Sequence, residues 1–268
     1  AMTASAIAAS MDGKKQKASI KGLAITTARI AGSQTISFAG NLLVVFPMSL
    51  ILYYVFTRST GIALVHSVTD AKQILTSNHP LTSLSLLYAA FTGVFLFLSG
   101  IISGYVHSRS LFGKIPERIR LHFLNRILPY HLAENITRYL KQNLGSLAGN
   151  FALGFFLGTA AFIGFILGIP YDIRHITIAS GNYIIGLFEA FPYITLSQIW
   201  IGFWGVLAIG FINFLVSFSL ALYVAIKSRN ISLSDYANYL QTVVRYFFRY
   251  PADFLFPPTT ERKESDLD

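Results

Sequence analysis

Four stretches of the chain are long, apolar and free of Asp, Glu, Lys and Arg. They are Phe38–Thr57, Leu84–Val106, Leu147–Ile169 and Ile199–Ile226. A helix rises about 1.5 Å per residue, so about 20 residues cross a hydrocarbon core roughly 30 Å thick. The sequence therefore predicts four transmembrane helices. The alternative is a soluble domain, and it requires four buried helices of full membrane length in a chain of 268 residues.

The composition agrees with a lipid environment. Charged residues make up 12% of the chain and hydrophobic residues 53%, whereas a soluble domain is about 25% charged. The 23 Phe and 14 Tyr side chains suit lipid-facing surfaces and headgroup belts. The chain has no Cys, which excludes disulfides, thiolate metal sites and cysteine nucleophiles.

The basic residues alternate along the chain. The segments before, between and after the four stretches hold 5, 2, 7, 1 and 6 Lys or Arg residues in turn. Basic loops stay on the cytoplasmic side of a membrane. The pattern predicts a multi-pass membrane protein with both termini in the cytoplasm. The net charge of +9 then indicates a membrane surface rather than nucleic acid.

We divide the chain into a mobile basic segment at 1–30, a helical membrane domain at 31–258 and a polar tail at 259–268. The basic start lacks an apolar region with a cleavage site and does not resemble a signal peptide. The abrupt start suggests the end piece of a longer protein. The expected partners are therefore membrane lipids, the upstream part of the chain or another membrane protein, and a second copy of the chain.

Two segments are predicted to lie on the inner leaflet. Pro116–Leu144 has apolar residues at helical spacing on either side of Pro129, which indicates two short amphipathic helices. Ile231–Tyr250 indicates another surface helix. We expect four arginines of the first segment to contact lipid phosphates. They are Arg118, Arg120, Arg126 and Arg138. The alternative interpretation is a nucleic-acid patch.

The apolar segment Ile176–Ile194 is interrupted by polar residues and by Pro192. It is predicted to be a re-entrant or interfacial helix. A fifth span is the alternative, but it would place the C-terminal tail outside and break the charge alternation. The predicted fold is therefore all-α, with four spans, a re-entrant segment and amphipathic surface helices.

Small residues recur at four-residue spacing in two predicted spans, which favours close helix packing. The pairs are Gly100 and Gly104, Gly154 and Gly158, and Gly164 and Gly168.

Three Gly-Asn pairs share a local pattern. They are Gly40-Asn41, Gly149-Asn150 and Gly181-Asn182. Two parallel two-span units would explain the repetition. The alternative is that Gly-Asn is a favoured helix entry, with Asn capping free N–H groups.

The strongest candidate for a functional cluster follows the third span. Asp172, Arg174 and His175 lie together at one membrane boundary, beside the interrupted segment. Asp172 and Arg174 can pair, and an imidazole titrates near neutral pH. Asn182 and Glu189 complete the candidate set, with Glu189 expected to pair with Arg174 or to face water. The alternative is a turn whose charges anchor a helix end.

Recognised catalytic motifs are lacking. No nucleophile elbow, Walker loop, zinc-protease motif or dinucleotide-binding glycine run occurs. The six His residues do not cluster like metal ligands. The sequence therefore predicts no cofactor and no metal, and it favours a non-enzymatic role.

Several segments nevertheless resemble a known family. The sequence around the Asp172–His175 cluster, Gly168-Ile169-Pro170-Tyr171-Asp172-Ile173-Arg174-His175-Ile176-Thr177, is the most specific of them. Others are Phe38–Asn41, Leu86 with Tyr88–Val94, Leu147–Asn150, Leu153–Gly158 and Asn213–Leu222. Together they resemble the C-terminal membrane portion of the bacterial site-specific recombinase family, of the gonococcal recombinase type.

This resemblance implies DNA strand exchange. A tyrosine recombinase uses Arg and His around the scissile phosphate, but Arg174 and His175 are adjacent rather than three residues apart. The residues favour a scaffold or transport role, with nucleic acid an unlikely partner. DNA recombination is the alternative, and a lipid-modifying enzyme with His175 as base and Asp172 as its orienting group is a third.

Overall fold

The computed structural model describes residues 20–168, 172–227 and 233–256. Helices make up nearly all of this part, and none of it forms a strand. Four helices are long and apolar enough to cross a membrane. They are α2 (Ile20–Thr60), α4 (Ser85–Phe112), α7 (Tyr130–Leu167) and α9 (Leu196–Lys227). The predicted all-α fold with four helices that could span a membrane is confirmed, and each of these helices extends beyond the predicted span at one end or both.

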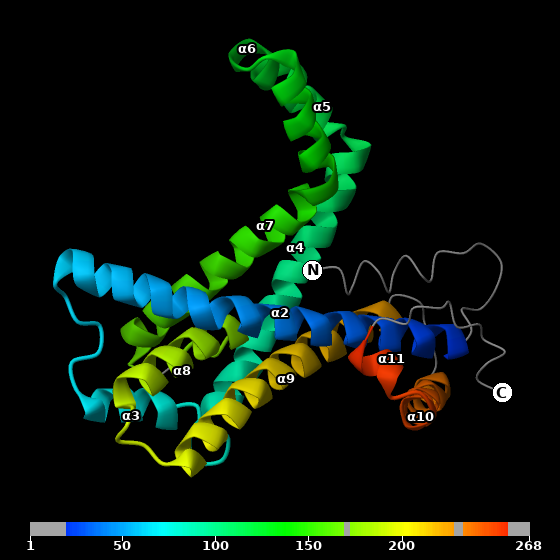
Figure 1. The fold of residues 1–268 in the computed structure, drawn as a ribbon. Coiled ribbons are helices and arrows are strands. Elements are labelled where there is room, and N and C mark those ends of the chain that lie inside the picture. Colours follow the sequence, from blue (N-terminus) through cyan, green and yellow to red (C-terminus); the bar gives the residue numbers. More distant parts are fainter. Residues whose placement is uncertain (1–19, 169–171, 228–232, 257–268) are drawn as a thin grey trace.

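The helices α4 and α7 form an antiparallel hairpin (Figure 1). Its tip consists of α5 (Ile115–Ile119), the π-helical turn η1 (Arg120–Leu124) and α6 (Asn125–Ile127). Small residues bring the two long helices together. A Cβ on Gly149 would lie 2.8 Å from Ser103 Cβ, and one on Gly145 would lie 2.8 Å from Ser103 O. The backbones are therefore closer than larger side chains would permit.

The glycines predicted to mediate this packing are different ones. A Cβ on Gly104, Gly154 or Gly158 would meet nothing within 4 Å. Of the predicted pairs, Gly100 and Gly164 are buried. The prediction was wrong for Gly104, Gly154 and Gly158, because four-residue spacing identifies a face without saying which face meets a neighbour.

The second surface helix predicted within Pro116–Leu144 is not a separate helix but the first part of α7. The break at Pro129 occurs as predicted, with Leu128 extended. Beyond it, the chain continues as α7 without interruption into the third span. The basic segment is thus the projecting end of the hairpin.

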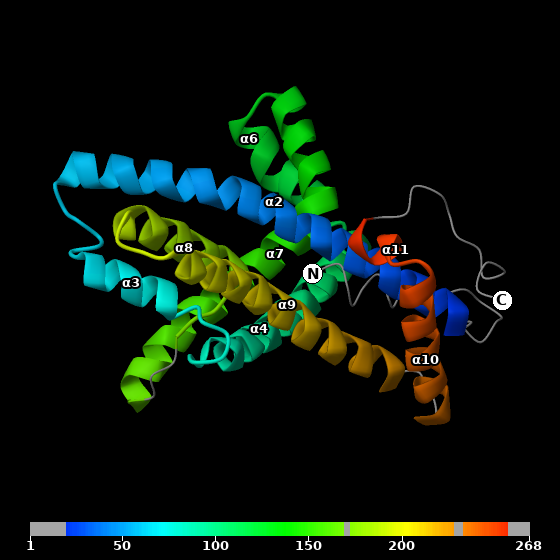
Figure 2. The same cartoon turned by 60° about the horizontal axis from the view of Figure 1, so that its bottom comes forward.

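The main core joins α3 (Val68–Thr76), α8 (Ile176–Ala190), α9 and α2. Figure 2 shows α2, α8 and α9 side by side, with α3 next to them. Tyr183 and Ile209 are among the buried residues, and Phe46 of α2 packs against them.

The helix α8 has 15 residues, or about 22 Å of length, and is too short to cross a bilayer. Its start contacts the middle of α9, where Ile176 N donates to Asn213 Oδ1 (3.2 Å). Its second half lies beside the start of α9, where Tyr183 donates to Ile199 O (3.0 Å). The helix α8 therefore lies antiparallel to the first half of α9, and its re-entrant position in a membrane stays a prediction.

The first half of α2 is covered by α10 (Leu233–Arg249) and α11 (Ala252–Leu255). Leu23, Ala24 and Ala28 are buried there, and Thr27 Oγ1 lies 2.7 Å from Tyr239 Oη. Residues 20–30 therefore belong to a packed helix, which corrects part of the mobile segment predicted at 1–30. The rest of that segment and the tail at 259–268 lie outside the described residues.

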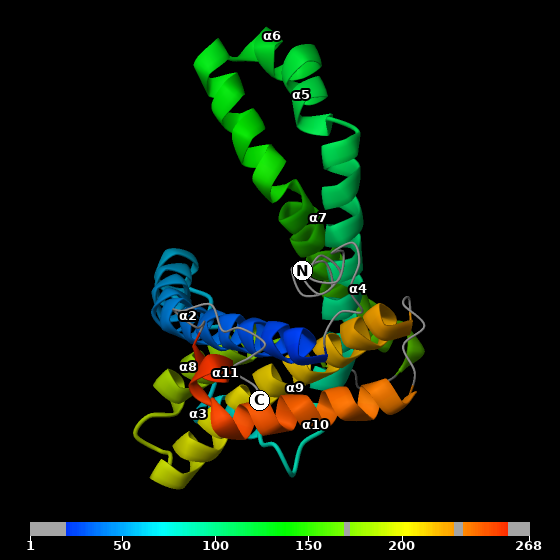
Figure 3. The ribbon, with the colours of Figure 1, turned by 90° about the vertical axis from the view of Figure 1, so that its right-hand side faces the viewer.

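The hairpin and the α2–α10 side of the molecule diverge from a common crossing region (Figures 1 and 3). At the opposite end, α3, the start of α4 and the α8–α9 connection lie together. We call the end of the molecule that carries α10 and α11 the α10 end, and the end where α3 lies the α3 end. In the predicted orientation they are the cytoplasmic and outer ends respectively.

Candidate polar cavity

A cavity of about 310 Å³ lies where the long helices cross. Its lining comes from α2, α4, α7, the start of α8 and α9. Its polar lining residues carry no acidic or basic side chain apart from one imidazole. They are Gln34, Ser37, Asn41, Asn150, His175, Thr177, Asn213 and Ser217. Polar groups in otherwise apolar helices cost free energy in a membrane, and where they gather they mark candidate functional sites.

Asn213 is the structural centre of this region. It is 2% exposed, and its Nδ2 donates to Ala89 O (2.8 Å) and to Arg174 O (3.0 Å). Its Oδ1 accepts from Ile176 N. One side chain therefore joins α4, α9 and the start of α8, and this holds the start of α8 at the middle of α9.

His175 reaches the cavity from the start of α8. Its Nδ1 accepts a hydrogen bond from Thr177 N (3.3 Å) and so caps the helix. A ring nitrogen that accepts carries no proton, so the proton of the neutral imidazole is on Nε2. The ring can thus donate toward a ligand.

Asn41 and Asn150 come from α2 and α7 and line the same cavity. Neither side chain makes a hydrogen bond within the described part of the chain, and the same holds for Gln34. They are positioned near the middle of their helices, not at helix starts, so the predicted helix-entry role is wrong for both pairs. The amide groups of the cavity wall remain available for a ligand.

The third Gly-Asn pair does not join them. Gly181 packs α8 against α2, because a Cβ there would lie 2.9 Å from Ser49 Oγ. Asn182 is exposed. Gly40 has open space around its Cα, while Gly149 packs on α4. The three pairs therefore have three different surroundings.

The candidate cluster separates into two parts. Arg174 is 8% exposed and donates to Asn78 Oδ1 (2.6 Å), Ser77 Oγ (3.2 Å) and Asp172. The predicted Asp172–Arg174 pair is confirmed. It ties the segment before α8 to the end of α3, whereas His175 alone lines the cavity.

Glu189 does not pair with Arg174, and it is only partly exposed. Tyr53 of α2 donates to its Oε1 (2.8 Å). Arg174 precedes α8 and Glu189 occupies its last turn, so the helix holds them about 20 Å apart. The predicted pairing with Arg174 is wrong for this reason.

The four arginines predicted to contact lipid lie in the α4–α7 hairpin, at its tip and in the first turns of α7, apart from α10 (Figure 1). Arg120 forms an ion pair with Glu134, while Arg118, Arg126 and Arg138 are exposed. Lys141 pairs with Glu117 (2.8 Å), and its hydrogen bond holds the pKa of that carboxyl below its usual range. Contact of these arginines with lipid phosphates stays a prediction.

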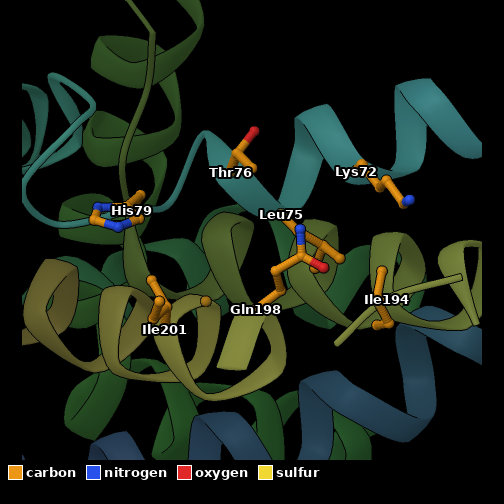
Figure 4. A pocket seen from close by; sticks show the side chains of 8 residues that line it. Lys72, Leu75, Thr76, His79, Ile194, Gln198 and Ile201 are labelled. Carbon is orange, nitrogen blue, oxygen red and sulfur yellow. The ribbon is translucent and has the colours of Figure 1, made fainter. Parts of the chain in front are cut away.

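A second, smaller pocket of about 50 Å³ lies between α3 and α9 (Figure 4). Lys72, Thr76, His79 and Gln198 are its polar residues. The His79 Nδ1 already accepts from Leu81 N and Thr82 N, both at 3.2 Å. This imidazole shapes the turn before α4, and the pocket offers little room for a ligand.

Sequence reasoning missed Gln34, Ser37 and Ser217. Gln34, Ser37 and Asn41 are spaced three and four residues apart in α2, as are Asn213 and Ser217 in α9. This spacing places each set on one helix face. A search for polar residues on one face of an apolar helix would have found them.

The described residues contain no group of three His, Asp or Glu side chains that could hold a metal ion. The Asp172 carboxylate binds Arg174, and the His175 Nδ1 is engaged by the backbone. A catalytic His175–Asp172 pair is therefore not formed.

A family model described as site-specific recombinase matches residues 1–257. The chain belongs to the site-specific recombinase family. No curated protein and no solved structure matches it. In this member of the recombinase family, the matched region contains the four potential spans and every residue that lines the cavity.

Proposed function

We propose that this member of the site-specific recombinase family is a non-enzymatic transport protein of the bacterial inner membrane, which admits a polar group into the cavity between its spans. The cavity is the observation that carries the proposal. Uncharged amide, hydroxyl and imidazole groups converge there from helices distant in sequence. A purely structural role would not require amides that lack intramolecular partners.

The chemistry of the lining defines the cargo class. Asn, Gln, Ser and Thr side chains offer both donors and acceptors and carry no charge. Such a wall stabilises a polar solute or a lipid headgroup but does not compensate a lone ion. The positive end of α8 adds a modest preference for groups rich in oxygen.

The divergence of the helices supports entry from the α10 end. The α3 end holds the Arg174–Asn78–Asp172 contacts and the packed α3–α8–α9 core. The hairpin and α2 separate toward the other end (Figure 3). With the predicted orientation, cargo enters from the cytoplasm or from the inner leaflet.

Reconstitution tests the role directly. The full chain is placed in liposomes, and two fluxes are measured: the entry of urea or glycerol by light scattering, and the flipping of fluorescent phospholipid by dithionite quenching. We expect one flux to exceed that of protein-free vesicles. The double variant Asn41→Leu/Asn150→Leu should reduce it about tenfold, the ratio that corresponds to 1.4 kcal/mol.

The matched control is Leu43→Ala/Phe151→Ala, which alters exposed neighbours on the same two helices. Its flux should stay at the unmodified level. Absence of both fluxes, or equal fluxes from the cavity variant and the control, would contradict transport.

DNA recombination is the second candidate, favoured by the family and by the exposed hairpin arginines. It predicts DNA binding that weakens steeply with salt, since each phosphate contact releases counterions. Arg118→Gln/Arg126→Gln/Arg138→Gln should then abolish binding. Purified chain in lipid with no salt-sensitive affinity for DNA would remove this candidate.

A further inference from the structure

An apolar groove of about 300 Å³ runs between α2 and α8, away from the polar cavity. Leu50, Ile51, Tyr53, Tyr54, Val55 and Phe188 line it. The surrounding surface of α2 is also apolar, with Leu52 60% exposed. A groove of this kind on a potential membrane span meets lipid chains rather than water.

Two tyrosines that line this groove contact opposite charges. Tyr53 donates its hydroxyl to Glu189 Oε1 (2.8 Å). The ring of Tyr54 carries the Arg58 guanidinium, whose Cζ lies 5.4 Å from the ring centroid. The aromatic walls thus hold one carboxylate and one guanidinium beside the same apolar surface.

Glu189 is in an unfavourable place for an anion. It lies in the last turn of α8, where the helix dipole is negative, and it is only partly exposed. No Lys or Arg of the described residues pairs with it, and Tyr53 engages only one of its oxygens. A cation with N–H donors would offset both the dipole and the desolvation.

Arg58 is suited to an anion. It is exposed in the last turn of α2, and no Asp or Glu of the described residues pairs with it. A guanidinium stacked on an aromatic ring keeps its planar donors free, and these match the oxygens of a phosphate.

We propose that this groove binds a phospholipid that carries both a phosphate and a primary ammonium. An acyl chain occupies the apolar groove, Arg58 holds the phosphate, and Glu189 accepts hydrogen bonds from the ammonium. This aminophospholipid site lies toward the α3 end, where α2 and α8 finish. It is independent of the proposed transport role, because none of its residues lines the polar cavity.

Three lipids with similar chains separate the contributions. Phosphatidylethanolamine has the phosphate and the N–H donors, phosphatidylcholine lacks the donors, and phosphatidylglycerol lacks the cation. Retention of each lipid by the full chain in detergent is measured by native mass spectrometry. We expect phosphatidylethanolamine to be favoured about tenfold over the other two, the ratio that corresponds to 1.4 kcal/mol.

Two variants test the two charges. Glu189→Gln should remove the preference for phosphatidylethanolamine and leave phosphatidylglycerol unchanged. Arg58→Gln changes an exposed side chain, so the fold is retained, and it should weaken retention of all three lipids. Glu117→Gln is the control, because this acid belongs to the distant hairpin, and it should change nothing.

The outcome that overturns the site is equally defined. Equal retention of the three lipids by the unmodified chain would refute it. So would a Glu189→Gln protein that keeps the preference, or an Arg58→Gln protein that binds as the unmodified one does. If Glu189→Gln fails to fold, Tyr53→Phe is the second variant. It removes the hydroxyl that positions the Glu189 carboxylate, and it must reduce the preference for phosphatidylethanolamine.

Discussion

Two walls of the polar cavity use the same residue type in opposite ways. On the α4–α9 wall, Asn213 is buried and makes three hydrogen bonds to the backbone. On the α2–α7 wall, Asn41 and Asn150 make none within the described part of the chain. The first asparagine builds the fold, and the other two remain available to a ligand. An intramembrane polar residue therefore has to be judged by its partners and not by its type.

The largest effect is expected at Asn213. Asn213→Leu leaves Ala89 O, Arg174 O and Ile176 N without their buried partner, and each unsatisfied group costs about 1–3 kcal/mol. We expect a loss of about 3 kcal/mol or more in the free energy of unfolding. Thermal unfolding in detergent or lipid measures this loss of stability. A variant as stable as the unmodified protein would show that Asn213 does not hold α4, α8 and α9 together.

A smaller loss is expected in the hairpin. Gly149→Val pushes new methyl groups against Ser103, whose Cβ is already 2.8 Å from an added Cβ. Overpacking costs about 1–3 kcal/mol. Gly154→Val lies on the same helix with nothing within 4 Å and should be nearly neutral. Equal melting temperatures for the two variants would show that the helices do not meet at Gly149.

Arg174 should rank next. Arg174→Gln keeps hydrogen-bonding capacity but loses the contacts with Asp172 and part of those with Ser77 and Asn78. We expect the free energy of unfolding to fall by about 1–2 kcal/mol. Because the Arg174 side chain does not line the cavity, flux through reconstituted protein should change little. A larger effect on flux than on stability would place Arg174 in the pathway instead.

The smallest effect on stability is expected at Asn150. Asn150→Leu breaks no intramolecular hydrogen bond and replaces a polar side chain by an apolar one in an apolar helix. The free energy of unfolding should change by less than about 0.5 kcal/mol, while flux falls. A large loss of stability in Asn150→Leu would show that Asn150, like Asn213, helps to hold the fold together.

The sequence predicted much of the fold for a clear reason. Four charge-free stretches and the alternation of basic loops depend only on the thickness and polarity of a bilayer. The same reasoning excluded Ile176–Ile194 as a fifth span, and α8 has only 15 residues. The continuity of α7 through residues 130–167 was missed, because amphipathic spacing does not distinguish a surface helix from the projecting end of a span.

The site was less predictable. Asp172, Arg174 and His175 are adjacent in sequence, yet only His175 faces the cavity. Asn41, Asn150 and Asn213 are distant in sequence, and their meeting depends on how helices cross. That crossing is set by close contacts such as Gly149 with Ser103 and Gly93 with Val216. Periodicity in a single sequence does not specify which helix faces meet.

The central claim is that water and polar cargo reach the face of α7 that carries Asn150. The chain has no native Cys, so Asn150→Cys and Phe151→Cys can be compared without background. Phe151 is the next residue and is 80% exposed on the apolar outer surface. With the protein in lipid, a polar, uncharged and water-soluble thiol reagent should label Asn150→Cys and leave Phe151→Cys unlabelled. Equal labelling of both, or of neither, would contradict a polar cavity between the spans.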